Sequence, residues 1–235
     1  MHNLYEGIIL RSIDYKDNDK ILTLFSRTGK ISLIAKSVKN GKRGNLLDIG
    51  NLISYNKVKT KGLDILTTVI IKNSFAHIKE SNSFYIIFLL EVILKIQRDS
   101  IDESLIYDTL IFCIKNLENT PKLYLCLFLE KMLYYEGVFI DLYTCRVCGY
   151  EFSDTDKIII SSEGLTHIKC SNLSDSNIDN TTIKLLRYLS MFDIGRNKVK
   201  FRVEESTLSE ALFYLISFIE NFFSSEIRSK SYLNI

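Results

Sequence analysis

Apolar and polar residues follow two different periods along this chain of 235 residues. Up to about residue 79, short stretches rich in β-branched and aromatic residues alternate with turn-forming residues, which is typical of strands. Two pairs of these stretches flank "RTG" and "KG", where Gly29 and Gly62 can take the positive φ angles of hairpin turns. The pattern predicts five strands, with two hairpins among them.

Five strands in fewer than 80 residues are best closed as a small barrel, because an open sheet would leave unpaired edges and one bare face. An oligonucleotide-binding (OB) barrel is the natural candidate, although an SH3-like barrel fits the pattern nearly as well. We therefore expect residues 1–79 to form an OB-type domain.

From about residue 81 the apolar period changes to about 3.6, which is typical of helices. Residues 82–98 and 101–117 are apolar all round, as expected of helices buried in a bundle. A third helix begins where Thr120 can cap it and Pro121 can occupy its first position, and it ends at Gly137.

Two further helices are predicted for "TIKLLRYLSMF" and "TLSEALFYLISFIENFF", the second with Thr207 and Glu210 in capping-box spacing. A polar, turn-rich insert at about 141–180 precedes them. Residues 80–235 are thus expected to form an all-helical domain that carries an insert. The fold class is α+β in two parts, a five-stranded barrel followed by helices.

The bulk composition is that of a folded globular protein, with 46% hydrophobic and 25% charged residues. The most apolar run, residues 84–94, is too short to span a bilayer and contains Glu91. The features of a signal peptide are missing from the first residues. We therefore expect a cytoplasmic protein, in which cysteines are thiols or metal ligands rather than disulfides.

Charge is divided unevenly along the chain. Residues 1–79 contain fourteen Lys and Arg against six Asp and Glu, a net charge of +8, whereas the remainder has sixteen against twenty-two, a net charge of −6. This asymmetry indicates a basic module that can meet polyanions, joined to an acidic module.

The basic module contains a loop, "AKSVKNGKRGN", that can follow a phosphate backbone without choosing a sequence. A solvated hairpin tip is the alternative interpretation of the same loop. Its basic residues are Lys36, Lys39, Lys42 and Arg43.

Aromatic side chains near this loop could stack on bases, as in many single-strand binders. The candidates are Tyr15, Phe25 and Tyr55. Phe25 alternates with leucines and fits a core position better, and Tyr55 suits either role.

Four potential metal ligands occur in the insert. Cys145 and Cys148 form a C-x2-C pair, and after eighteen intervening residues His167 and Cys170 form an H-x2-C pair. Two such turns can build a tetrahedron of three thiolates and one imidazole, a set that suits zinc best, with iron a lesser possibility. All four positions would be filled by protein, so the ion would be structural. The alternative is a knuckle that no longer holds metal.

No catalytic constellation accompanies these features. His2, His77 and His167 lie in no recognisable nucleophile or metalloprotease motif, and "RTGKIS" lacks the first glycine of a P-loop. We therefore expect no enzymatic activity, and a nuclease is disfavoured.

Three stretches, taken in order, resemble the bacterial RecO family of DNA recombination and repair mediators. "EGIILRSIDYKDNDKILTLFSRTGKISLIAKSVK" is similar to the opening of that family, "FLEKMLYYEGVFIDLYTCRVCG" to its helix, glycine and zinc-knuckle junction, and "IRSKSYL" to its closing segment. The resemblance covers nearly the whole chain.

The resemblance implies a nucleoid-associated protein that binds single- and double-stranded DNA and anneals complementary strands. With RecR, such proteins help to load the RecA recombinase onto strands covered by single-stranded-DNA-binding protein (SSB). The zinc-bearing members usually have cysteine where this chain has His167. DNA contacts would fall on Lys36, Lys39, Lys42 and Arg43, and zinc on Cys145, Cys148, His167 and Cys170. The competing hypothesis is a partner-binding adaptor with only incidental DNA affinity.

Overall fold

A computed structural model describes residues 4–39, 44–75, 82–96, 102–118, 120–161, 164–171, 177–195 and 202–235. The chain divides into two compact units, Met1–Ile111 and Phe112–Ile235. This division falls inside helix α2 (Glu103–Lys115). The domain boundary expected after residue 79 stays a prediction.

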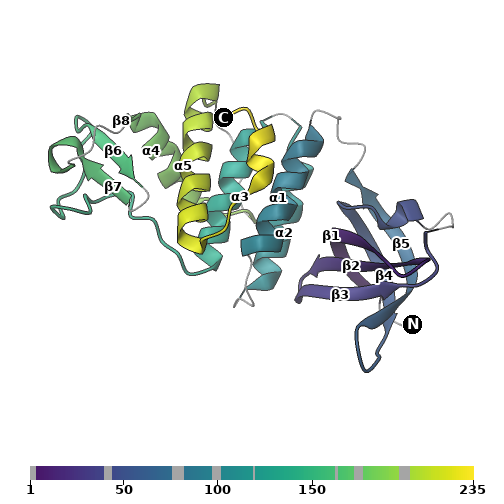
Figure 1. The fold of residues 1–235 in the computed structure, drawn as a ribbon. Coiled ribbons are helices and arrows are strands. Elements are labelled where there is room, and N and C mark those ends of the chain that lie inside the picture. Colours follow the sequence, from purple (N-terminus) through teal and green to yellow (C-terminus); the bar gives the residue numbers. More distant parts are fainter. Residues whose placement is uncertain are drawn as a thin grey trace. The chain divides into compact units, whose positions relative to one another are not determined.

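Five strands form a closed barrel in the first unit (Figure 1). Neighbours follow the order β1-β2-β3-β5-β4, and every pair is antiparallel except β3 with β5. This Greek-key closure is that of an OB barrel and confirms the prediction. The strands are β1 (Tyr5–Tyr15), β2 (Asp19–Ser26), β3 (Gly29–Ala35), β4 (Asn51–Val58) and β5 (Asp64–Ser74), with a short 3-10 helix, η1 (Gly44–Leu47), between β3 and β4.

The barrel interior is filled by aliphatic side chains from every strand. Each fully buried Leu or Ile contributes roughly 1.5–3 kcal/mol relative to exposure. Close strand approach also limits side-chain size, because a Cβ added to Gly7 would lie 3.0 Å from the carbonyl oxygen of Phe25. The core includes Ile9, Leu22, Leu24, Leu33, Ile53 and Leu66.

The two predicted hairpins close differently. Gly29 has a φ of +91°, as predicted for the β2–β3 turn. Gly62 does not adopt a positive φ, so that expectation was wrong. The β4–β5 connection, residues 59–63, is long enough to close through Thr60, whose hydroxyl donates to the Leu63 carbonyl (2.9 Å) and accepts the Gly62 N–H (3.1 Å).

Helix α1 (Ser83–Ile96) and the start of α2 belong to the first unit and match the helices predicted there. The β2–β3 turn is fastened to α2, because Arg27 donates to Asp108 (2.6 Å) and to Ser104 (3.3 Å). The Tyr107 hydroxyl donates to Glu6 of β1 (3.0 Å). This end of the barrel is therefore occupied by a helix.

The second unit contains helices α3 (Pro121–Tyr135), α4 (Asn180–Met191) and α5 (Glu205–Phe223), followed by the 3-10 helix η5 (Arg228–Tyr232). The insert contains a small sheet in the order β7-β6-β8. None of the helices described, in either unit, combines the length and apolarity needed to cross a bilayer. The strands are β6 (Ile158–Ser161), β7 (Gly164–His167) and β8 (Asn177–Ile178).

Helix α3 begins and ends at the predicted residues, but its start lacks the predicted side-chain cap. Gly137 has a φ of +74°, and the N–H groups of Gly137 and Val138 bond to the carbonyls of Tyr134 (3.1 Å) and Leu133 (2.9 Å), which is a Schellman end. Pro121 occupies the first turn, but the Thr120 side chain makes no capping hydrogen bond. Thr120 therefore occupies the N-cap position, and only the side-chain bond expected from it was wrong.

The capping box expected for α5 was also wrong. The helix begins at Glu205, so Thr207 lies inside it and is buried. Glu210 instead accepts the N–H of Asp179 (3.2 Å) and the hydroxyl of Thr182. Its carboxylate therefore serves the start of the neighbouring helix α4.

Candidate metal centre and nucleic-acid surface

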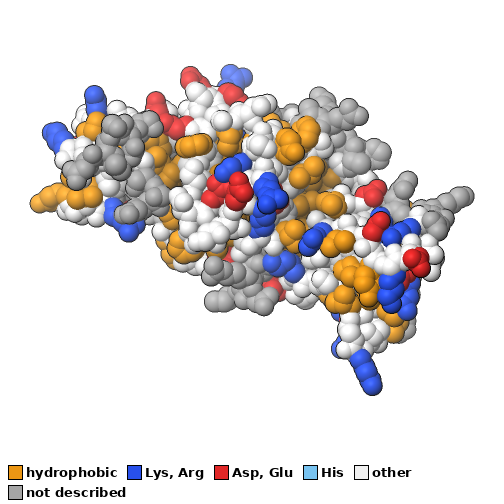
Figure 2. Space-filling model, viewed as in Figure 1, with side chains coloured by type: hydrophobic (Ala, Val, Ile, Leu, Met, Phe, Trp, Pro, Cys, Tyr) orange, Lys and Arg blue, Asp and Glu red, His pale blue; other side chains and the backbone are white. Residues whose placement is uncertain are grey.

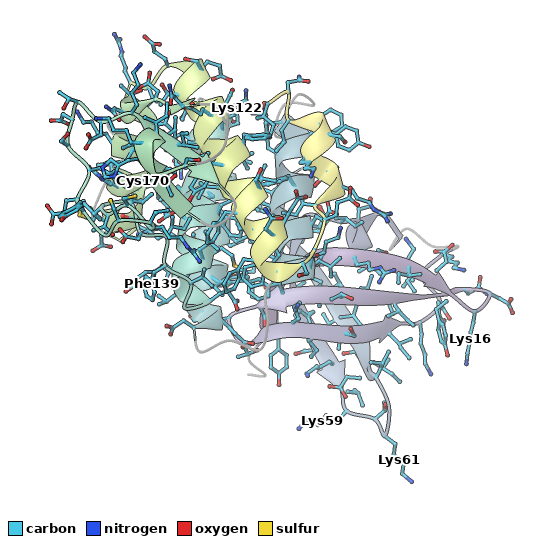
Figure 3. All side chains as sticks on the ribbon, turned by 60° about the vertical axis from the view of Figure 1, so that its left-hand side comes forward. Lys16, Lys59, Lys61, Lys122, Phe139 and Cys170 are labelled. Carbon is cyan, nitrogen blue, oxygen red and sulfur yellow. The ribbon has the colours of Figure 1, made fainter. Side chains whose placement is uncertain are left out.

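Four side chains in the insert bring their metal-binding atoms within 4.8 Å of one another. Cys145 and Cys148 lie in the loop after α3, His167 ends β7, and Cys170 ends the short 3-10 helix η4 (Ile168–Cys170). Figure 3 labels Cys170 in this region. The two sequence pairs, separated by eighteen residues, thus form one cluster.

Backbone contacts bring the two halves of the cluster together. In the first half, Gly149 has a φ of +74° and donates its N–H to the Cys145 carbonyl (2.8 Å), which forms the knuckle turn. The N–H of Arg146 then bonds to the carbonyl of Leu165 in β7 (3.0 Å). Because His167 follows two residues later in the same strand, this bond places the knuckle beside the second half.

The electrostatics of the cluster favour a cation. Burial acts to raise the pKa of the Cys145 thiol, but the backbone N–H groups of Cys148, His167 and Val147 outweigh it and lower this pKa to about 6. The pKa of Cys170 is raised to about 11 by burial and by the neighbouring Cys148 and Cys145 sulfurs. A divalent ion would offset the repulsion among these thiolates. The donor set fits a Cys3His structural site, so the cluster could bind a metal such as zinc.

The described part of the basic loop is fastened to the β1–β2 turn, residues 16–18. The N–H groups of Val38 and Lys39 bond to the Asn18 carbonyl (2.8 and 3.2 Å). The Lys39 ammonium donates to the Lys16 carbonyl (2.8 Å) and lies 3.5 Å from Asp14. Lys36 is exposed. Lys42 and Arg43 lie outside the described residues.

Two other connections add lysines that the sequence reasoning missed. OB barrels bind oligonucleotides with the β2–β3 face and the β1–β2 and β4–β5 loops. Lys16 lies at the β1–β2 turn, and Lys59 and Lys61 extend from the β4–β5 connection (Figure 3). Basic side chains also gather on this part of the surface in the space-filling view (Figure 2). The sequence did contain a signal for these lysines, because they lie at predicted turns and both turns are loops of the same barrel.

The aromatic candidates differ in how deeply their side chains are buried. Phe25 and Tyr55 are 0% and 2% exposed, so both belong to the core, and burial with the nearby Tyr5 raises the pKa of Tyr55 to about 12. Tyr15 is 37% exposed, with the Lys16 ammonium 5.3 Å from its ring centre. Tyr5, which the sequence reasoning did not consider, is 52% exposed beside Lys57. Tyr15 and Tyr5 are thus the aromatics of this group that a base could reach.

Two family models match the chain: "Recombination protein O N terminal" over residues 1–75 and "Recombination protein O C terminal" over residues 81–231. Three similar proteins bear the name DNA repair protein RecO. The Clostridium perfringens protein is 27% identical over 91% of this chain and 89% of its own length. The Mesoplasma florum protein is 26% identical over 96% of this chain and 86% of its own length. The Bacillus cereus protein is 26% identical over 99% of this chain and 97% of its own length. Because the two models together match nearly all of the sequence, the chain belongs to the RecO family.

Proposed function

We propose that this protein is a non-enzymatic, DNA-binding recombination mediator. It binds single- and double-stranded DNA, anneals complementary strands and, with RecR, helps to load RecA onto SSB-coated single strands. The observation that carries the proposal is an OB barrel with a lysine-rich loop region in a chain of the RecO family. The name of the similar proteins supports a role in DNA repair.

The barrel offers two kinds of basic residue. Arg27 is engaged with Asp108 of α2, whereas Lys16, Lys36, Lys59 and Lys61 are exposed in loops. Lysines in such loops contact phosphates and release counterions, and this binding is independent of base sequence. A mediator that anneals strands of any sequence needs this kind of contact. Lys39 contributes less, because its ammonium already pairs with Asp14; Lys42 and Arg43 remain proposed contacts.

We infer that the cluster of Cys145, Cys148, His167 and Cys170 holds one structural zinc ion. When bound, the ion cross-links the knuckle turn to the end of β7 and to η4. Because the four side chains fill every position of a tetrahedral site, the ion stabilises the insert and has no position left for substrate.

The adaptor hypothesis has one observation in its favour. A cleft of about 710 Å³ in the second unit is lined by residues 137–141 and by part of α5. Phe139 and Phe222 in its lining are 73% and 54% exposed, and two exposed aromatic side chains in one cleft suit a protein partner such as RecR or SSB. A pure adaptor would bind partners there without annealing DNA.

DNA binding is tested by a variant with Lys16, Lys36, Lys59 and Lys61 all changed to alanine. We expect weaker binding to single-stranded DNA and a slope of log K against log salt that is flatter by roughly 0.7–0.9 for each lost contact. Arg27→Ala is the matched control, since it removes one charge from the same barrel but from a residue paired with Asp108. Equal slopes for the fourfold variant and the wild type would show that these loops do not contact DNA.

Zinc binding is tested by elemental analysis of protein purified without chelator. We expect about one zinc per chain, and its loss in the Cys145→Ser, Cys148→Ser double variant together with a lower melting temperature. Cys113→Ala, which changes a buried thiol of α2, should retain the zinc. A metal-free wild type would contradict the site.

A further inference from the structure

We propose that Asp156 is a positioning residue that makes Nδ1 of His167 the metal-binding atom. The proposal rests on the zinc site inferred above. It goes further in assigning which imidazole nitrogen binds the ion and which residue outside the cluster fixes that choice.

The two nitrogens of His167 have different neighbours. Nδ1 lies 3.4 Å from the Cys148 sulfur, whereas Nε2 lies 3.3 Å from a carboxylate oxygen of Asp156. A neutral imidazole carries one N–H, and a carboxylate can only accept a hydrogen bond. Nε2 therefore donates to Asp156, and the lone pair of Nδ1 is directed toward the thiols. Metal-binding histidines usually donate their second N–H to a carboxylate or carbonyl in this way.

Asp156 is itself held in place by a tight turn before β6. The same carboxylate oxygen that faces His167 accepts the N–H of Ser153 (2.7 Å), and the Asp156 N–H bonds to the Ser153 carbonyl (3.2 Å). The carboxylate is thus fixed before any metal binds.

Further contacts hold both the ring and the backbone of His167 in place. The ring of Phe152 packs edge-on against His167 with ring centres 4.9 Å apart. The backbone N–H of His167 points to the Cys145 sulfur at 3.4 Å. With Asp156 at Nε2, the ring is held in an orientation that presents Nδ1 to the cluster.

The chemistry predicts that Asp156 matters only because residue 167 is a histidine. An imidazole must lose the proton from one particular nitrogen, and a carboxylate at the other nitrogen fixes this choice. A cysteine thiolate has a single donor atom and no tautomers, so it gains nothing from Asp156. Replacing His167 with cysteine should therefore remove the dependence on the carboxylate.

The test compares the zinc affinity of four proteins by competition with a chromogenic chelator: wild type, Asp156→Ala, His167→Cys and the double variant. We expect Asp156→Ala to weaken zinc binding about 10- to 100-fold when His167 is present. In the His167→Cys background the same change should alter affinity by less than about threefold. Asp154→Asn is the control, because this neighbouring acid pairs with Lys184 and is 82% exposed.

The outcomes separate this proposal from the zinc site itself. An equal loss in both backgrounds would show that Asp156 supports only the turn, and an unchanged affinity would show that it plays no part; either overturns the proposal and leaves the zinc site standing. A wild type that binds no zinc overturns both. Long-range ¹H–¹⁵N NMR of the zinc-bound protein should show His167 with a proton on Nε2, and a proton on Nδ1 would contradict the assignment.

Discussion

At the scale of single residues, the pKa of Glu130 in α3 is set by two opposing effects that the sequence does not reveal. Its side chain is 7% exposed, and Oε2 has no hydrogen-bond partner among the described residues. Burial raises its pKa to about 7, although the neighbouring Lys131 acts in the opposite direction. Near neutral pH this carboxyl group therefore changes charge inside the second unit.

The pH dependence of stability follows from the sign of this shift. Because the folded pKa is above the unfolded value of 4.5, the contribution of Glu130 is fully present below pH 4.5 and is lost as the pH rises through about 7. The loss amounts to roughly 3 kcal/mol. We expect Glu130→Gln to raise the free energy of unfolding in urea at pH 8 relative to wild type, and to have little effect at pH 5.

Glu118→Gln is the control, since it makes the same chemical change at an exposed position of the same unit. Comparing each variant with wild type at the same pH also cancels the pH dependence of zinc binding. A Glu130→Gln protein that is equally destabilised at pH 5 and pH 8 would contradict the buried-charge explanation.

At the scale of elements, Glu210 connects two helices. It belongs to α5, yet it accepts the Asp179 N–H (3.2 Å) and the Thr182 hydroxyl at the start of α4. The first N–H groups of a helix need acceptors from outside it. Glu210 supplies one of them and joins α4 to α5.

We expect Glu210→Ala to lower the free energy of unfolding by about 1–2 kcal/mol, because it removes the acceptor of the partly buried Thr182 hydroxyl and of the exposed Asp179 N–H. Glu210→Gln keeps one acceptor oxygen and should lose less. Glu204→Ala is the matched control, since Glu204 precedes α5 and its side chain makes no capping bond. Equal urea midpoints for the Glu210→Ala and Glu204→Ala proteins would show that the bond between the helices adds nothing.

The elements were predictable where the signal is local. Alternation and turn glycines predicted the five strands, and a 3.6 period predicted the helices, because each depends on residues close in sequence. The carboxylate of Glu210 was predicted to cap its own helix, since spacing cannot show that the start of α4 lies within reach. The ion pair between Lys39 and Asp14 was not predicted, because the two residues are neighbours only in the folded barrel. The metal cluster was predictable because each C-x2-C or H-x2-C turn is itself local.

At the scale of the whole molecule, the charge division of the sequence corresponds to two kinds of structure. The basic segment forms a barrel with exposed lysines in its loops, and the acidic remainder includes the helices, the cysteine cluster and a cleft with exposed phenylalanines. A mediator needs both a surface for DNA of any sequence and a surface for protein partners. The adaptor hypothesis needs only the second.

The rate at which complementary strands anneal, with and without an SSB coat, tests the mediator most directly. We predict that the wild-type protein accelerates annealing in both cases, and that the variant lacking Lys16, Lys36, Lys59 and Lys61 loses most of this acceleration while Arg27→Ala retains it. Wild-type protein that binds DNA or SSB but leaves both annealing rates unchanged would contradict the mediator and support the adaptor.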